Sequence, residues 1–373
     1  MDNLESCTVV INPRRYPRAV SKLEKILERT DVSKVIISKS KEDFIYSVEN
    51  FYENNSENLL VWGGDGTAHD AINALMNAKA KTTIPKKKSI GFLRGGSGNG
   101  IQDSYEVPHY LVRPLEKQLE CYSESMKNGY KIDVNLIKIN QDNLESYCQL
   151  AGFGFDVEVL KRRESRIYKK GVLRGEARAG MKNYILSSLS ALSSGFSAIE
   201  NDFEIELCDG KNVVVGQRTR AEHEFNSLLR RTTAPLIEMG VRPYYGKMFK
   251  ICPEVVCNDG YMNLYLFNFK DEWDALKNVF WLYTGRHDQI NRKFISDTRP
   301  PIERYKIKKA AISSEKEFYY HIDGELKLSE KSDDELYRIS FEVVQNAINF
   351  LVPKTFYKSF NWFDEDPEII SKT

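Results

Sequence analysis

The sequence lacks several patterns that would assign it to a common functional class. Its six cysteines are scattered without the paired spacing of a metal site, and its five histidines do not cluster. No apolar run reaches the roughly 20 residues that a membrane-spanning helix needs. The charges nearly cancel to a net +1 and form no long basic stripe, which argues against a dedicated nucleic-acid-binding protein.

What remains is the composition of an ordinary globular protein. The chain has 373 residues, of which 41% are apolar and 29% charged, enough for two domains of usual size. Residues 1–5 are acidic and have no apolar core, so we find no signal peptide. We expect a cytoplasmic protein with reduced thiols, and we expect any contact with a bilayer to be peripheral.

One stretch predicts a phosphate-binding turn. An apolar strand pattern at residues 59–62 is followed at once by Gly63-Gly64-Asp65-Gly66-Thr67, and a helical pattern begins at Ala68. Such a turn presents backbone N–H groups at the positive end of a helix, and Thr67 can cap that helix. Asp65 places a carboxylate among the expected phosphates, which indicates Mg²⁺ between them. A plain strand-to-helix turn would explain a glycine pair but not the whole motif, and the lysine of a Walker loop is absent.

A second glycine turn follows the next predicted strand. Residues 89–93 are apolar and lead into Gly95-Gly96-Ser97-Gly98-Asn99-Gly100. Strands and helices alternate from residue 8 onward, which predicts a parallel sheet with helices on both faces. Both glycine turns would lie at carboxyl ends of strands, where ligands bind in such sheets, so the two turns can share one site.

The pattern changes near Lys131. Alternating β segments with turns at Asp209-Gly210 and Asp259-Gly260 predict a largely antiparallel second domain with some helix. We therefore predict an α/β protein with a Rossmann-like parallel-sheet domain at residues 1–130 and a β-sandwich domain at residues 131–344. The apolar stretch at residues 347–353 predicts a return of the tail, residues 345–373, to the first domain.

At this point the motifs resemble those of one family along nearly the whole chain. In order, they are Asn12-Pro13, Gly63-Gly64-Asp65-Gly66-Thr67, Gly96-Ser97-Gly98-Asn99, Ile132-Asp133-Val134, residues 151–158, Asn258-Asp259-Gly260-Tyr261 and Asp323-Gly324-Glu325. This series is similar to that of the diacylglycerol kinase and sphingosine kinase family of lipid kinases. The resemblance implies transfer of the γ-phosphoryl group of ATP to a lipid hydroxyl, with Mg²⁺, at a membrane surface. It implies a nucleotide-binding first domain and a lipid-substrate second domain, and leaves monomer and homodimer both open.

The resemblance also assigns roles to residues. Asp65 would hold the catalytic Mg²⁺ through water, and Glu325 would accept the proton with Asp323 beside it. Asp133 and Asp156 would face the lipid head group. The nucleotide would be bound by Asn12, Gly63, Gly64, Asp65, Gly66, Thr67, Gly96, Ser97, Gly98 and Asn99, and a structural Mg²⁺ by Asp259 with the carbonyls of Val256 and Tyr261.

Simpler interpretations stand beside these roles. The segment at Asp323 could be a solvent-facing hairpin, Asp259 could belong to an ordinary turn, and Asp156 could be a helix cap or a surface acid. His321, next to the late motif, reads as a packed or exposed histidine rather than a catalyst.

The sequence departs from the family pattern at several places. Arg14-Arg15-Tyr16 replaces the glycines that usually follow Asn-Pro, Arg94 replaces a proline, and Gly100 replaces an acid common in bacterial diacylglycerol kinases. The lipid, whether diacylglycerol or a sphingoid base, therefore stays open. Two alternatives to a lipid kinase are an NAD kinase, whose later Asn-Glu pair we do not find, and a non-catalytic nucleotide- or lipid-binding relative.

Overall fold

The chain folds as two compact units. The structure is a computed structural model that describes residues 4–13, 17–82, 88–96, 98–109, 114–141, 144–174, 190–191, 195, 202–245, 249–293, 299–332 and 335–365. One unit comprises Met1–Val134 and Asn346–Thr373, and the other comprises Asn135–Gln345. The chain passes from one unit to the other within two long strands, β5 (Lys131–Gln141) and β17 (Tyr337–Leu351).

The first unit is built on a parallel sheet. Its strands are β1 (Cys7–Ile11), β2 (Lys34–Ile37), β3 (Asn58–Gly63) and β4 (Ser89–Arg94), in the order β2-β1-β3-β4. The final residues of β17 pair in parallel with β4, with Asn349 opposite Ser89. Strands β1, β3 and β4 are buried because helices cover them, as parallel sheets require.

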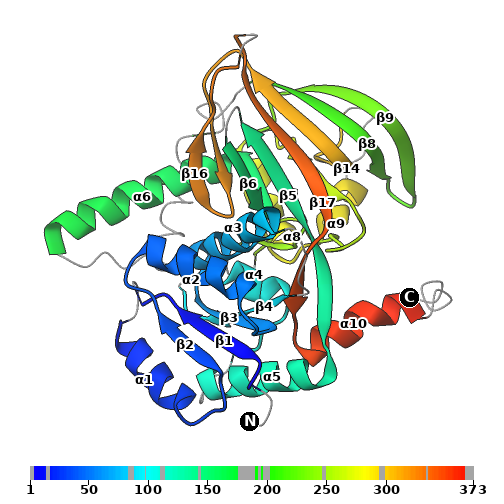
Figure 1. Ribbon diagram of the computed structural model, residues 1–373. Coiled ribbons are helices and arrows are strands. Elements are labelled where there is room, and N and C mark those ends of the chain that lie inside the picture. Colours follow the sequence, from blue (N-terminus) through cyan, green and yellow to red (C-terminus); the bar gives the residue numbers. More distant parts are fainter. Residues whose placement is uncertain are drawn as a thin grey trace. The chain divides into compact units, whose positions relative to one another are not determined.

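Helices flank this sheet on both faces (Figure 1). The helices of this unit are α1 (Pro17–Leu27), α2 (Lys41–Glu53), α3 (Asp65–Lys81), α4 (Gly100–Ser104), α5 (Pro114–Asn128) and α10 (Lys354–Glu365). Leu23 of α1 and Leu119 of α5 pack with Val9, Leu60 and Leu93 in one core. The predicted α/β class, with a parallel sheet between helices, is confirmed.

The second unit is largely antiparallel, as predicted. Its further strands are β6 (Leu144–Cys148), β7 (Leu150–Gly154), β8 (Phe203–Val215), β9 (Arg220–Thr232), β10 (Leu236–Gly240), β11 (Tyr244–Tyr245), β12 (Phe249–Lys250), β13 (Met262–Phe267), β14 (Ile302–Ser314), β15 (Tyr319–Ile322) and β16 (Glu325–Leu328). Strands β16-β15-β7-β10-β13-β14 are neighbours in that order, and β8 and β9 continue from β14. The helices are α6 (Phe155–Arg174), α8 (Glu272–Tyr283) and α9 (His287–Lys293).

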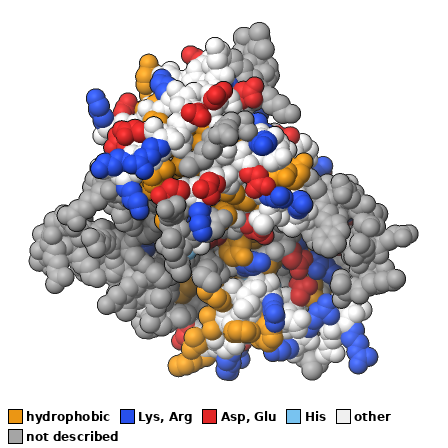
Figure 2. Space-filling model, turned by 90° about the horizontal axis from the view of Figure 1, so that it is seen from below, with side chains coloured by type: hydrophobic (Ala, Val, Ile, Leu, Met, Phe, Trp, Pro, Cys, Tyr) orange, Lys and Arg blue, Asp and Glu red, His pale blue; other side chains and the backbone are white. Residues whose placement is uncertain are grey.

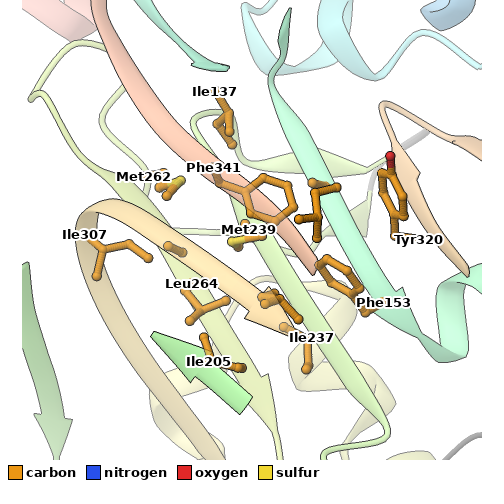
Figure 3. Packing of buried hydrophobic residues seen from close by; sticks show 14 of the residues in the cluster. Ile137, Phe153, Ile205, Ile237, Met239, Met262, Leu264, Ile307, Tyr320 and Phe341 are labelled. Carbon is orange, nitrogen blue, oxygen red and sulfur yellow. The ribbon is translucent and has the colours of Figure 1, made fainter. Parts of the chain in front are cut away.

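One apolar core joins these strands (Figure 3). Phe153 of β7, Met239 of β10, Leu264 of β13 and Phe341 of β17 all belong to it and are at most 1% exposed. Their strands lie far apart in the sequence, so the core depends on long-range pairing rather than on local contacts. Strands of this core also carry polar residues discussed below, among them Glu238 of β10 and His321 of β15.

Three details differ from the sequence-based expectation. The pair Asp209-Gly210 does not end a strand: β8 continues through it, with Asp209 at a left-handed φ of 52°. Strand β2 is a half-exposed edge strand, whereas the apolar strands of a parallel sheet are expected to be buried. Strand β9 was not predicted because it is polar and exposed along nearly its whole length, so it has no apolar alternation to detect.

The surface fits the near-neutral composition. On the face drawn in Figure 2, basic and acidic side chains are interspersed. Among the described residues, none of the helices is both long enough and apolar enough to cross a bilayer.

Candidate active site

The first glycine turn joins β3 to α3. Strand β3 ends at Gly63, Gly64 is the N-cap without a side-chain hydrogen bond, and Asp65 is the first helical residue. The prediction that Thr67 caps the helix is wrong, because Thr67 lies inside the first turn. Its Oγ1 instead accepts a hydrogen bond from Asn12 Nδ2 at 3.2 Å. A Cβ atom at Gly63 would lie 2.4 Å from Thr67 Cβ, so only glycine fits there.

The second glycine turn packs directly against the first. The N–H of Gly95 donates to the carbonyl of Gly63 at 2.9 Å. A Cβ atom at Gly96 would lie 2.3 Å from the Cα atom of Gly64, and one at Gly98 would lie 2.5 Å from Asp65 Oδ2. Strands β3 and β4 are parallel neighbours, so their carboxyl ends bring the two turns together, as expected from the sequence.

Asn99 closes the second turn on itself. Its Oδ1 accepts from the N–H of Gly96 at 3.2 Å, and its Nδ2 donates to the Gly96 carbonyl at 3.1 Å. The side chain therefore shapes the turn. Ser97, which we also predicted to bind nucleotide, lies outside the described residues.

Asp65 lies where the two turns meet. Its Oδ1 accepts a hydrogen bond from the N–H of Ile101 at 3.2 Å, which ties the first turn to the start of α4. It also begins α3, a helix of 17 residues whose N-terminal dipole favours anions. A carboxylate beside an anion site is repulsive unless a cation lies between them, so this donor set fits a phosphate together with a divalent metal ion.

Arg94, which stands in place of a proline, has a structural role. Its guanidinium bonds Asp103 Oδ1 at 2.6 Å and the carbonyl of Val107 at 2.7 Å. The backbone N–H of Arg94 donates to Gln118 Oε1 at 2.8 Å. These contacts pin the segment after the second turn. Arg14 and Arg15 lie outside the described residues.

The late motif forms a two-residue hairpin between β15 and β16. Asp323 and Gly324 both have positive φ, 48° and 85°, as a type I′ turn requires. The turn does not face solvent at Asp323, whose carboxylate accepts from the N–H of Leu150 at 3.1 Å and lies 3.3 Å from Arg242. The Asp323 and Arg242 side chains are almost fully buried. Glu325 differs: its side chain is 34% exposed and lies 3.6 Å from Lys327 Nζ.

The two acids predicted to face a lipid head group lie in different surroundings. Asp133 is exposed, accepts from Asn349 Nδ2 at 2.9 Å, and lines a pocket of about 230 Å³ that also contains Lys79 and Lys88. Asp156 is only 4% exposed and belongs to the first turn of α6. Asp156 is therefore a buried acid and not a surface acid.

Asp156 belongs to a buried cluster with Glu238 and His321. His321 Nε2 lies 3.2 Å from Glu238 Oε1 and 3.9 Å from Asp156 Oδ2. Burial raises the pKa of Asp156 far above its usual range, and the neighbouring Glu238 raises it further. Burial also raises the pKa of Glu238 to about 8 and lowers the pKa of His321 to about 4.

We did not predict this cluster from the sequence. Glu238 is the lone charged residue in the apolar strand β10, and that isolated acid was the available signal. His321 is fully buried, which agrees with its interpretation as a packed histidine.

The predicted structural metal site is a tight turn. Asp259 Oδ1 accepts from the N–H of Tyr261 at 3.0 Å, and Gly260 has a φ of 78°. The second carboxylate oxygen lies 3.6 Å from Lys306 Nζ. Burial raises the pKa of Asp259, against the lowering effect of its hydrogen bond and of Lys306. Val256 is exposed, and binding of Mg²⁺ here stays a prediction.

The fold and the paired turns define a class: a two-unit α/β protein with glycine turns at the carboxyl ends of neighbouring parallel strands. Residues 6–130 match the family model described as diacylglycerol kinase catalytic domain. A Staphylococcus aureus (strain Newman) protein named "Putative lipid kinase" is 22% identical over 300 residues, 80% of this chain and 78% of its own length.

Two solved structures from Bacillus anthracis share the fold. One, described as a "putative diacylglycerol kinase", has a TM-score of 0.61 at 17% identity over 95% of this chain and 98% of its own. Another, described as a diacylglycerol kinase, has a TM-score of 0.54 at 16% identity over 94% and 98% of the two chains. The resemblance to the diacylglycerol kinase-like family of lipid kinases, predicted from the motifs, is confirmed.

Proposed function

We propose that this protein is an ATP-dependent lipid kinase that transfers the γ-phosphoryl group to the hydroxyl of diacylglycerol or of a sphingoid base. This proposal rests mainly on the contact between the two glycine turns. Gly64 and Gly96 approach so closely that neither tolerates a Cβ atom, and Asp65 lies at the same place. Backbone in that conformation can approach phosphate oxygens without side chains in the way.

The chemistry requires positioning and charge neutralisation more than covalent help. In this proposal the first turn of α3 orients the phosphates, and Asn12 holds Thr67 in place. Asp65 would hold Mg²⁺, which supplies charge neutralisation at the transferred phosphoryl group. Gly98 leaves room for the Asp65 carboxylate, since a Cβ there would meet Oδ2. The residues present therefore fit the nucleotide and the ion that the family implies.

We propose Glu325 as the acceptor of the proton from the lipid hydroxyl. The hairpin that carries Glu325 is rigid, because the Asp323 carboxylate is held by Arg242 and by backbone N–H groups of Gln149 and Leu150. Asp323 is then a positioning residue that fixes the turn, and Glu325 is the partly exposed carboxylate. A base must be held in place and accessible, and the fixed turn and the partial exposure of Glu325 support this role.

Helix α8 supports the proposal that the protein works at a membrane surface. Its outer face exposes large apolar side chains at helical spacing: Trp273 (65%), Leu276 (45%), Val279 (50%), Phe280 (60%) and Tyr283 (45%). Its inner face, with Leu282 and Trp281, packs on a core. A helix that is apolar on both faces is unfavourable in water, whereas Trp, Phe and Leu suit the bilayer interface. We assign this face to contact with the bilayer that holds the lipid substrate.

A panel of acceptors with γ-labelled ATP tests the proposal. The full chain is incubated with Mg²⁺ and vesicles containing diacylglycerol, sphingosine or neither, and with NAD in a separate reaction. We expect label in the organic extract of one lipid-containing reaction. Label on NAD would assign an NAD kinase, and nucleotide binding without transfer to any acceptor would assign a non-catalytic relative. Either result would overturn the proposal.

A further inference from the structure

The buried cluster of Asp156, Glu238 and His321 is fixed by the sheet. Strand β7 lies between β10 and β15, and Gly152 of β7 is directly opposite both Glu238 and His321. The two side chains therefore stand on either side of a residue that has none. Asp156 follows two residues after β7 ends at Gly154, where a φ of 84° turns the chain into α6. The three side chains converge from backbone positions that cannot easily move apart.

Gly152 keeps a space open inside the cluster. A Cβ atom at residue 152 would lie 2.3 Å from Glu238 Oε1 and 2.4 Å from His321 Nε2. The glycine has an ordinary strand conformation and needs no special φ. Its role is therefore to leave room for the polar atoms that face it.

Polar atoms of the cluster lack partners. Among the described residues, Asp156 Oδ2 and Glu238 Oε2 are buried without a hydrogen bond. Glu238 and His321 are 0% exposed and Asp156 is 4% exposed. Buried polar atoms are nearly always satisfied by protein, by ordered water or by an ion, because an unsatisfied one is costly. These atoms indicate a ligand.

The spacing of the ligand atoms suits a metal ion. His321 Nε2 lies 3.2 Å from Glu238 Oε1 and 3.9 Å from Asp156 Oδ2. One possible ligand atom from each residue lies within 4.8 Å of the others. Ligands at about 2.0–2.2 Å from a dication are roughly 3.0–3.5 Å apart. The cluster therefore needs only small side-chain shifts to close around an ion.

The charges of the cluster also favour a bound dication. Two buried carboxylates repel each other, and a dication between them makes the group neutral. Arg242 supplies only part of this balance, because its single positive charge also pairs with Asp323. An imidazole in the set argues against Mg²⁺, which prefers oxygen ligands, and favours a first-row transition metal.

We propose that Asp156, Glu238 and His321 bind a divalent transition-metal ion, with Zn²⁺ as the best match to two carboxylates and one imidazole. The ion would fasten the first turn of α6 to strands β10 and β15. This site is distinct from the Mg²⁺ that Asp65 would hold.

Metal titration of the full chain tests the assignment. The protein is stripped with a chelator and titrated with Zn²⁺ in excess Mg²⁺, so that oxygen-only sites are filled. We expect one tight Zn²⁺ equivalent and a rise in Tm. His321→Ala should lose both. Gly152→Ala should weaken binding at least tenfold without removing a ligand. The control His223→Ala changes an exposed histidine of β9 and should keep both.

A spectroscopic measurement on the unmodified chain covers the case in which variants fail to fold. Substitution with Co²⁺ should give the visible absorption of a bound ion with nitrogen and oxygen ligands, displaced by one equivalent of Zn²⁺. The proposal is wrong if the stripped protein shows no Zn²⁺-dependent Tm rise or no displaceable Co²⁺ spectrum. It is also wrong if Glu238→Gln matches the wild type in Zn²⁺ affinity, since a proton shared between the acids would then account for the cluster.

Discussion

Replacing Gly96 with alanine tests whether the contact between the glycine turns serves catalysis. The new Cβ atom would lie 2.3 Å from Gly64 Cα and 2.5 Å from the Gly98 carbonyl oxygen, both of them backbone atoms. Carbon atoms in contact are about 3.5–4.0 Å apart, so the turns must separate by at least about 1 Å. A misplacement of that size costs about 100-fold in rate, or about 2.7 kcal/mol of transition-state stabilisation.

The assay is kcat/KM for ATP with saturating lipid, measured together with Tm. Gly129→Ala is the matched control, because its Cβ would meet no atom of the described residues within 4 Å, while its φ of 68° strains an alanine. The control should lose about 1 kcal/mol of stability and keep its activity. Gly96→Ala should lower kcat/KM at an assay temperature at which its Tm shows that the protein is still folded. Wild-type kcat/KM in Gly96→Ala would refute the view that close approach of the turns positions the phosphates.

Four further results are expected. Asp65→Asn should reduce kcat by at least about 100-fold with an unchanged Tm; full activity would exclude a role in holding Mg²⁺. Glu325→Gln should slow single-turnover transfer by about 100-fold or more while ATP affinity stays the same, and an unchanged rate would remove it from the mechanism. Trp273→Ser together with Phe280→Ser should weaken sedimentation with lipid vesicles and leave ATP binding intact; equal sedimentation would contradict contact through α8. Burial lowers the pKa of His287 from 6.5 to about 4, so the unfolded chain takes up the proton first as pH falls. The stabilisation is present above pH 6.5, is lost as pH falls toward 4, and amounts to about 3 kcal/mol. Urea unfolding at pH 7.5 and 5 should show a smaller pH effect in His287→Gln, and equal pH effects would contradict this.

Much of the first unit could be predicted because its signals are local. Apolar runs ending in glycine turns, with helices between them, identify parallel strands and their carboxyl ends. Contact between the turns at Gly64 and Gly96 then follows from strand order alone. The capping role of Thr67 could not be judged from the sequence, because Gly64 is the N-cap and Thr67 instead accepts a hydrogen bond from Asn12.

The second unit was harder because its contacts are long-range. Glu238, Gly152 and His321 are neighbours only through the pairing of β10, β7 and β15, and no local pattern contains that pairing. The same holds for Asp323, whose partner Arg242 is 81 residues away in the chain. The hairpin shape of the late motif was visible in its residues, whereas the burial of Asp323 was not.

A crystal structure of the full chain with ADP and Mg²⁺ tests the central claim most directly. The account predicts phosphate oxygens against the backbone N–H groups of the turn from Gly63 to Thr67, with Mg²⁺ near the Asp65 carboxylate. Nucleotide bound elsewhere, or phosphates turned away from both glycine turns, would contradict it.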